Sequence, residues 1–96
     1  MKQPAVYIVT NRQYGTLYTG VTSNLAARIW LHREKSTPGF TRRYGCSLLV
    51  WCEFHEDMLS AIAREKQLKG GSRARKVALI EEANPEWRDM YDDLVG

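Results

Sequence analysis

AVYIVTNRQYGTLYTGV, residues 5–21, sets the architecture of this chain. Residues 5–10 and 16–21 are rich in β-branched and aromatic side chains, which favour strands. The polar residues 11–15 between them end on Gly15, which is typical of a turn. Because the connection is short, the two strands are predicted to pair as an antiparallel hairpin.

Residues downstream of the hairpin predict one more strand and three helices. Helical spacing and N-cap residues indicate helices over residues 25–35, 58–69 and 72–84. Residues 40–45 are basic and aromatic, and we expect a loop or a single helical turn there. Residues 47–54 form an almost continuous apolar run, which predicts a strand buried on both faces, as at the centre of a sheet. The order β-β-α-β-α-α implies an α+β fold: a small three-stranded antiparallel sheet flanked by helices.

Length and charge narrow the class of protein. The 96 residues fit one domain, and the acidic tail after residue 85 is expected to dock in part through Trp87, Tyr91 and Leu94. No apolar run approaches the roughly 20 residues that span a bilayer, and the polar N-terminus does not resemble a secretory signal, so we expect a cytoplasmic protein. The net charge is +3, with Lys and Arg concentrated in residues 28–43 and 64–76. Such a basic middle can form a face that attracts phosphate.

The two cysteines are expected to be reduced thiols in strand and core positions. Cys46 and Cys52 are the only cysteines, and His32 and His55 are the only histidines. A structural zinc site usually has four ligands in closely spaced pairs, and these spacings do not provide them. A zinc centre is therefore not expected.

The first predicted helix carries two polar residues on its apolar stripe. Leu25, Arg28, Ile29 and His32 stand at positions i, i+3, i+4 and i+7, so they share one face. An arginine there calls for an anion, which could be a carboxylate of the chain or a phosphate of a ligand. The alternative is an arginine that extends to solvent and a histidine satisfied by a backbone carbonyl.

A carboxylate interrupts the apolar sector of the second predicted helix. Glu65 falls between Met58, Ala61, Ile62 and Lys69 on a helical wheel. Burying a carboxylate is costly unless it is paired or binds a metal ion. Two interpretations of Glu65 are therefore kept: it is a metal ligand, or it forms a salt bridge to Lys69 or to Arg28.

Three tyrosines complete the set of candidate residues. Tyr7 and Tyr18 lie on the two hairpin strands and could be neighbours on one face, although such pairs are common for packing alone. Tyr44 follows Arg42 and Arg43 and could stack on nucleic acid, or simply belong to an exposed basic loop. Two phenols, an arginine, a histidine and a carboxylate would together supply the base, charge clamp and metal ligand of a phosphodiester hydrolase.

The ordered set of motifs resembles a known family. Val6-Tyr7-Ile8, then Tyr18-Thr19-Gly20, then a helix carrying Arg28 and His32 resemble the GIY-YIG nuclease superfamily. Residues 64–69 and 84–87 are similar to its short stand-alone bacterial members, so the resemblance runs over residues 5–87. The departures are a first triplet without glycine, Thr19 in place of isoleucine, and Val21 where many members have lysine.

The resemblance implies a role for each matching position. Tyr7, Tyr18, Arg28 and His32 would be catalytic, and Glu65 would hold a divalent ion, Mg²⁺ or Mn²⁺. Supporting positions would be Gly20, Tyr44 and Asn84. The basic segments supply the candidate nucleic-acid contacts: Arg33, Lys35, Arg42, Arg43, Arg73, Arg75 and Lys76.

The function implied is a metal-dependent endonuclease. It would hydrolyse phosphodiester bonds in nucleic acid, with DNA in repair or recombination as the expected setting, and would leave 5′-phosphate and 3′-hydroxyl ends. Tyr7 would take a proton from the attacking water, directly or through a relay, and Arg28 would stabilise the transition state. Two other functions remain open: a non-catalytic nucleic-acid-binding module on the same fold, and a protein-interaction domain with an internal salt-bridge network.

Overall fold

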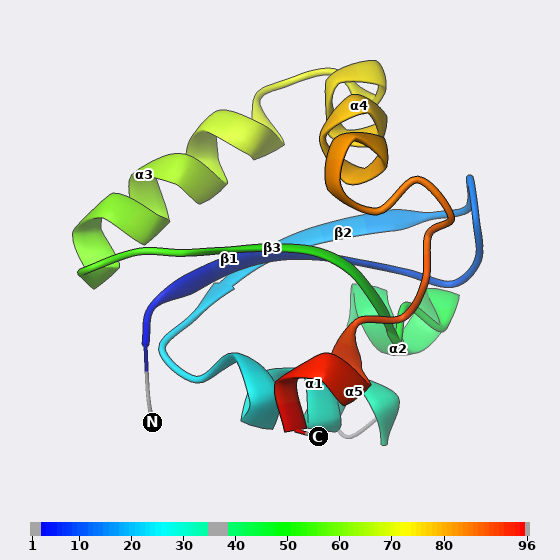
Figure 1. Cartoon of the computed structure of the whole chain (residues 1–96), viewed down its shortest axis with the longest axis horizontal. Helices are drawn as coiled ribbons and strands as arrows, with labels where there is room; N and C mark the ends of the chain where they lie inside the picture. The colour runs from blue at the N-terminus through cyan, green and yellow to red at the C-terminus, as the bar shows by residue number, and fades with distance from the viewer. Residues whose placement is uncertain (1–2, 35–38, 96) are drawn as a thin grey trace.

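The computed structural model describes residues 3–34 and 39–95, and it confirms the α+β class and the element order. Lys35 lies outside the described residues. Helices α3 and α4 cover one face of the sheet, while α1 and α5 cover the other (Figure 1). The elements run in chain order as β1 (Ala5–Thr10), β2 (Leu17–Thr22), α1 (Leu25–Arg33), α2 (Phe40–Tyr44), β3 (Leu48–Phe54), α3 (Met58–Lys69), α4 (Arg73–Ala83) and α5 (Tyr91–Val95).

The predicted hairpin forms, and a polar network closes its turn. Strands β1 and β2 pair antiparallel, with Tyr7 opposite Gly20. The Thr10 hydroxyl donates to the carbonyl oxygens of Arg12 and Thr16, each at 2.8 Å. The Asn11 side chain accepts the Thr16 backbone N–H at 2.9 Å. These bonds fix the register that places Tyr7 over Gly20.

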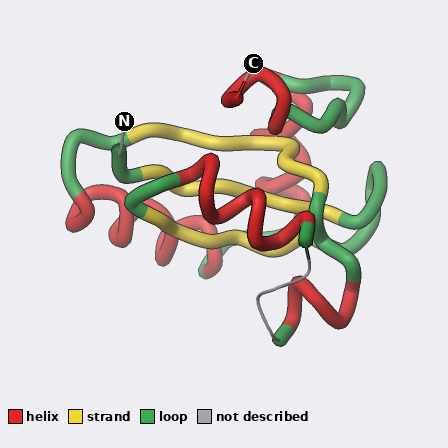
Figure 2. The backbone as a smooth tube through the Cα atoms, turned by 90° about the horizontal axis from the view of Figure 1, so that it is seen from below, coloured by secondary structure: helices red, strands yellow, loops and turns green. Residues whose placement is uncertain are grey.

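The prediction that the strand over residues 47–54 is central was wrong. The order is β2-β1-β3, so β1 is central and β3 is an edge strand (Figure 2). β3 is apolar because helices cover both of its faces, and the segment after α4 satisfies its outer backbone. Leu49 donates its N–H to the Asp89 carboxylate at 3.2 Å and accepts the Met90 N–H at 2.8 Å, and the Val50 carbonyl accepts from Asn84 at 3.1 Å.

The three predicted helix starts have the caps that the sequence indicated. Asn24, Asp57 and Ser72 each accept a backbone N–H three residues on with the side-chain oxygen. A cap of this kind contributes about 1 kcal/mol to stability. Helix α3 ends at Lys69, as predicted, and Gly70 is its C-cap.

Two apolar clusters hold the layers together. Val6 and Ile8 of β1 pack with α3 and α4 on one face, and Tyr7 and Val9 pack with α1 on the other. The tail docks as predicted: Trp87 is 4% exposed in the first cluster, and Tyr91 and Leu94 pack against the second. Helix α5, which the sequence did not indicate, forms within this tail.

The prediction that the cysteines occupy core positions is confirmed for Cys46 and only partly for Cys52. Both cysteines are free; Cys46 is buried and Cys52 is half-buried, and burial raises the pKa of each thiol. Among residues 3–34 and 39–95, no helix has the length and apolar character that crossing a membrane requires.

Candidate functional site

The phenol of Tyr7 is the centre of the site and is fully buried. Tyr7 is 1% exposed on the central strand, and its ring lies over the backbone of Gly20 on β2. A Cβ atom at Gly20 would lie 2.4 Å from the phenol oxygen and 2.5 Å from Cζ. The glycine is therefore required for space, because any side chain at position 20 would push the phenol aside.

Gly20→Ala is expected to destabilise the protein and displace Tyr7. Overpacking of this kind costs about 1–3 kcal/mol in the free energy of unfolding, which lowers Tm by roughly 4–8 °C per kcal/mol in a domain of this size. Thermal unfolding followed by circular dichroism measures the change. Gly70→Ala is the matched control, since its Cβ would approach nothing nearer than a carbonyl oxygen at 3.5 Å. Equal melting temperatures for the two variants would show that the phenol does not need the glycine.

Three rings meet around the Tyr7 phenol. The Tyr7 hydroxyl and His32 Nε2 are 2.9 Å apart, and His32 Nδ1 lies 3.1 Å from the hydroxyl oxygen of Thr41. The ring centroids of Tyr7 and Tyr18 are 6.5 Å apart, and those of Tyr18 and His32 are 6.0 Å apart. His32 is therefore not satisfied by a backbone carbonyl, which was one alternative; its ring bonds two side chains.

The Arg28 guanidinium acts on both Tyr7 and His32. Burial raises the pKa of the Tyr7 phenol well above its ordinary value, Tyr18 and Glu65 raise it further, and the charge and hydrogen bonding of Arg28 oppose the rise. Burial and then the charge of Arg28 lower the pKa of His32. At neutral pH the site therefore holds a protonated phenol, a neutral imidazole and a fixed positive charge.

We call the group formed by Tyr7, Tyr18, Arg28 and His32 the cluster. Glu65 reaches this cluster from the opposite layer of the fold, around the outer edge of β2. Its helix, α3, packs over β2 and β1 on the face away from α1. Glu65 forms a salt bridge with Lys69 at 3.1 Å, and the Lys69 Nζ lies 5.7 Å from the Tyr18 ring centroid. The negative charge of Glu65 also contributes to the raised pKa of Tyr7. The salt bridge to Lys69, which was one of the alternatives left open for Glu65, is thus present, and it lies beside Tyr18.

The donor set fits a hard divalent ion held by one carboxylate. The Glu65 side chain is 14% exposed, whereas that of its partner Lys69 is 49% exposed. In the described part of the chain no group of three or more His, Cys, Asp or Glu side chains could hold a metal ion. Mg²⁺ is commonly held by one or two carboxylates, with waters and substrate phosphates completing its shell. Glu65 matches that arrangement and does not match a closed zinc site.

Helix α2 is attached to the cluster through a residue that the sequence analysis did not identify. Thr41 is 6% exposed and bonds His32, while the next residues, Arg42 and Arg43, are exposed. The Arg43 guanidinium lies 5.6 Å from the ring centroid of Tyr44, which is 44% exposed. A basic, aromatic surface therefore adjoins the histidine. No sequence pattern could have indicated Thr41, because its role depends on where α2 packs.

Three of the remaining candidate residues lie apart from the cluster, and each of the three has an internal partner. Asn84 is buried at the outer edge of β3, where it bonds the backbone oxygens of Val50 and Arg88, so β1 separates it from β2. Arg33 pairs with Asp89 at 2.6 Å. Arg73 donates to the backbone oxygens of Tyr14 and Gly15, at 2.9 and 2.7 Å, and so ties α4 to the hairpin turn.

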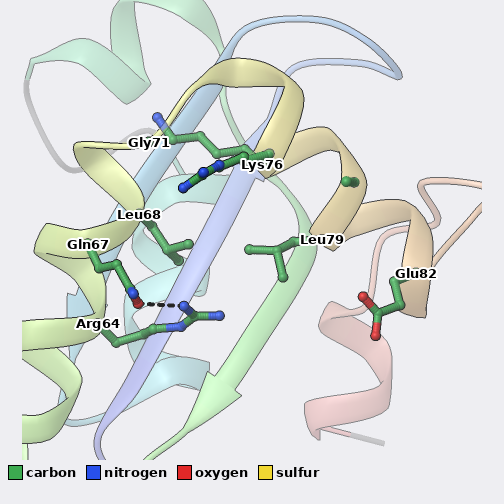
Figure 3. Close-up of a pocket in the computed structure, with 9 residues that line it drawn as sticks. Arg64, Gln67, Leu68, Gly71, Lys76, Leu79 and Glu82 are labelled. Carbon is green, nitrogen blue, oxygen red and sulfur yellow. Dashed lines mark hydrogen bonds between the residues drawn. The ribbon is translucent and has the colours of Figure 1, made fainter.

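Arg75 and Lys76 line a hollow between α3 and α4. It has a volume of about 300 Å³ and mixes the apolar side chains of Leu68 and Leu79 with polar ones such as Arg64 (Figure 3). None of Tyr7, Tyr18, Arg28, His32 and Glu65 lines it. The hollow is thus a separate feature from the cluster at the edge of β2.

Comparisons with known proteins identify relatives of this chain. A family model described as the GIY-YIG catalytic domain matches residues 3–78. A UPF0213 protein of Staphylococcus haemolyticus is 35% identical over 82 residues, which is 85% of this chain and 99% of the relative. A UPF0213 protein of Desulfotalea psychrophila is 36% identical, over 90% of this chain and 78% of the relative; one of Clostridium perfringens is 40% identical, over 68% and 70%. No solved structure matches the chain significantly.

Proposed function

The chain belongs to the GIY-YIG catalytic domain family, a family of nucleases, and on this premise we propose that it is a divalent-metal-dependent endonuclease acting on DNA. The proposal rests on one observation. Tyr7, Tyr18, Arg28 and His32 lie on one side of the sheet, and Glu65 joins them from the other side at the edge of β2. This combination supplies a proton acceptor, a charge clamp and a carboxylate ligand around one reacting phosphate.

The proton from the attacking water is proposed to leave through Tyr7 and His32. Because burial raises the pKa of Tyr7, a free phenolate is disfavoured at neutral pH. The neutral His32 ring, 2.9 Å away, can instead take the phenol proton while the phenol oxygen takes one from water. The hydroxide so formed makes the new bond to phosphorus, and the bond to the 3′ oxygen breaks. Solvent supplies the proton that completes the 3′-hydroxyl, and the 5′ end keeps the phosphate.

The other members of the cluster and Glu65 are proposed to stabilise charge on the phosphate and to orient the attacking water. Arg28 stabilises the negative charge that builds on the phosphate oxygens in the transition state. Glu65 would hold Mg²⁺ or Mn²⁺, whose charge polarises the phosphate when the ion is bound. Tyr18, beside both Tyr7 and His32, orients the attacking water.

Substrate binding is proposed to use the basic surfaces on two helices. Arg42, Arg43 and Tyr44 of α2 adjoin His32, and the exposed Arg75 lies with Lys76 on α4. Such contacts go mainly to phosphates and carry little sequence information. We therefore propose a weakly sequence-specific enzyme, with repair or recombination intermediates as its substrates.

A cleavage assay tests this function. The purified protein is incubated with single-stranded, duplex, flapped and branched DNA and the matching RNAs, in Mg²⁺, in Mn²⁺ or in EDTA. We expect internal cuts with 5′-phosphate ends on at least one DNA in the presence of a divalent ion, and none in EDTA. Binding without cleavage under every condition would support the non-catalytic module instead.

A further inference from the structure

Both ring nitrogens of His32 are bonded to side chains, and this constrains where its proton lies. His32 Nε2 is 2.9 Å from the Tyr7 hydroxyl, and Nδ1 is 3.1 Å from the Thr41 hydroxyl oxygen. All three side chains are buried: Tyr7, His32 and Thr41 are 1%, 5% and 6% exposed. A neutral imidazole has one N–H and one lone pair, so one nitrogen donates and the other accepts.

The groups around Tyr7 determine which atom donates in the Tyr7–His32 and His32–Thr41 hydrogen bonds. The Arg28 guanidinium carries only donors and a positive charge, and its effect on the Tyr7 phenol is to lower a pKa that burial raises. A positive charge near the phenol favours the arrangement in which the oxygen lone pairs face Arg28 and the phenol proton points to His32 Nε2, 2.9 Å away. That leaves the imidazole proton on Nδ1, with the Thr41 oxygen as its acceptor.

Thr41 is held in place by its own backbone. Its carbonyl oxygen accepts the N–H of Gly45, the C-cap of α2, and the N–H of Cys46 at 2.9 Å. Gly45 takes the left-handed conformation, with φ of 67°, which allows the chain to turn there and enter β3. Since Cys46 is fully buried in the second apolar cluster, the hydroxyl of Thr41 is presented to His32 from a fixed point.

We propose that Thr41 is a positioning residue: its hydroxyl oxygen holds His32 in the tautomer with the proton on Nδ1, so that Nε2 stays free to accept the Tyr7 proton. The role of this tautomer in cleavage rests on the proposed function above, whereas the tautomer itself does not. Helix α2 thereby joins the proton path to the surface that carries Arg42 and Arg43.

Two substitutions at position 41 separate hydrogen bonding from packing. Thr41→Val keeps the shape of the side chain and removes the oxygen, while Thr41→Ser keeps the oxygen and removes a methyl group. In Thr41→Val the Nδ1 proton has lost its acceptor, so the ring should change to the form protonated on Nε2. If Thr41→Val does not fold, Thr41→Ala removes the same oxygen without the bulk, and melting curves establish which variants are folded.

The primary measurement is the tautomer of His32 from ¹⁵N chemical shifts of the imidazole ring. We expect the Nδ1–H form in the wild type and Thr41→Ser, and a shift toward Nε2–H in Thr41→Val. His55, which bonds Glu53 at 2.8 Å, serves as an internal reference that should not change. An Nδ1–H form retained in folded Thr41→Val, or an Nε2–H form in the wild type, would overturn the proposal.

Single-turnover cleavage provides the second readout. We expect Thr41→Val to cut about tenfold more slowly with unchanged substrate affinity, as when a group that orients a functional histidine is lost, and Thr41→Ser to restore most of the rate. A switched tautomer with a wild-type rate would overturn the part of the proposal that concerns cleavage. A wild type that cuts nothing, with the tautomers as expected, would refute the proposed nuclease function and leave the positioning role standing.

Discussion

Glu65→Ala is expected to abolish metal-dependent cleavage and to leave nucleic-acid binding nearly intact. Glu65 is the carboxylate that the described residues bring to the cluster, and the ion that it is proposed to hold acts mostly on the transition state. Loss of such a group costs about 10²-fold or more in rate, some 3 kcal/mol or above. Binding comes from many Lys and Arg contacts, so removal of one negative charge should leave it unchanged or slightly stronger.

Single-turnover rates and equilibrium binding, measured on one substrate, test this expectation. Glu56→Ala is the charge-matched control, because Glu56 is exposed just before α3 and outside the cluster. The variant must also be folded, since Glu65 pairs with Lys69; an i,i+4 pair contributes only about 0.3–0.5 kcal/mol, so a large fall in Tm is not expected. A folded Glu65→Ala protein that cuts at the wild-type rate would show that Glu65 is not the metal ligand.

Arg28→Ala is expected to slow cleavage by about 10²–10³-fold with a modest loss of binding. The guanidinium is proposed to stabilise the charge that develops on the phosphate, an effect that is large in a water-poor site. Arg12→Ala is the matched control, because Arg12 is an exposed arginine in the hairpin turn. Equal rates for Arg28→Ala and Arg12→Ala would exclude a catalytic role for Arg28.

Arg28→Ala is also expected to change the pKa of His32. The positive charge of Arg28 disfavours protonation of His32 and so lowers its pKa. Removal of that charge should therefore raise the pKa of His32, and the ring would be protonated, and unable to accept a proton, at a higher pH than in the wild type. An NMR titration of His32 measures this directly. An unchanged or lower pKa of His32 would show that Arg28 does not act on the ring.

Local sequence signals predicted most of the fold because they act over a few residues. The hairpin depends on two β-rich runs and a polar turn, and the caps Asn24, Asp57 and Ser72 bond the backbone only three residues away. The position of β3 could not be predicted in this way. Its edge is covered by Asn84, Asp89 and Met90, which lie more than thirty residues downstream, and an apolar run does not reveal which neighbour covers it.

The candidate site shows the same division between local and tertiary information. Helical spacing placed Arg28 and His32 on one face, and the structure brings both to Tyr7. Spacing could not show that Glu65 reaches the cluster around the edge of β2, or that Thr41 bonds His32. The roles of these residues in catalysis stay predictions.

The basic residues show where charge patterning alone misleads. A count of Lys and Arg treats every cation as available to phosphate. In the structure Arg33 is paired with Asp89, and Arg73 is bonded to the hairpin turn. Both can contact a ligand only by sharing or leaving these partners, whereas Arg42 and Arg43 are exposed beside His32. The surface on α2 is therefore the stronger candidate for substrate contact.

A double-mutant cycle on Glu65 and Arg28 tests whether residues from the two layers of the fold form one hydrolytic site. Single-turnover rates in Mg²⁺ are measured for the wild type, Glu65→Ala, Arg28→Ala and the double variant on the same substrate. Residues that act as a unit have strongly non-additive effects, so we expect the double variant to be about as slow as the slower single variant. Losses that multiply in the double variant, or single variants that cut as fast as the wild type, would contradict a shared site.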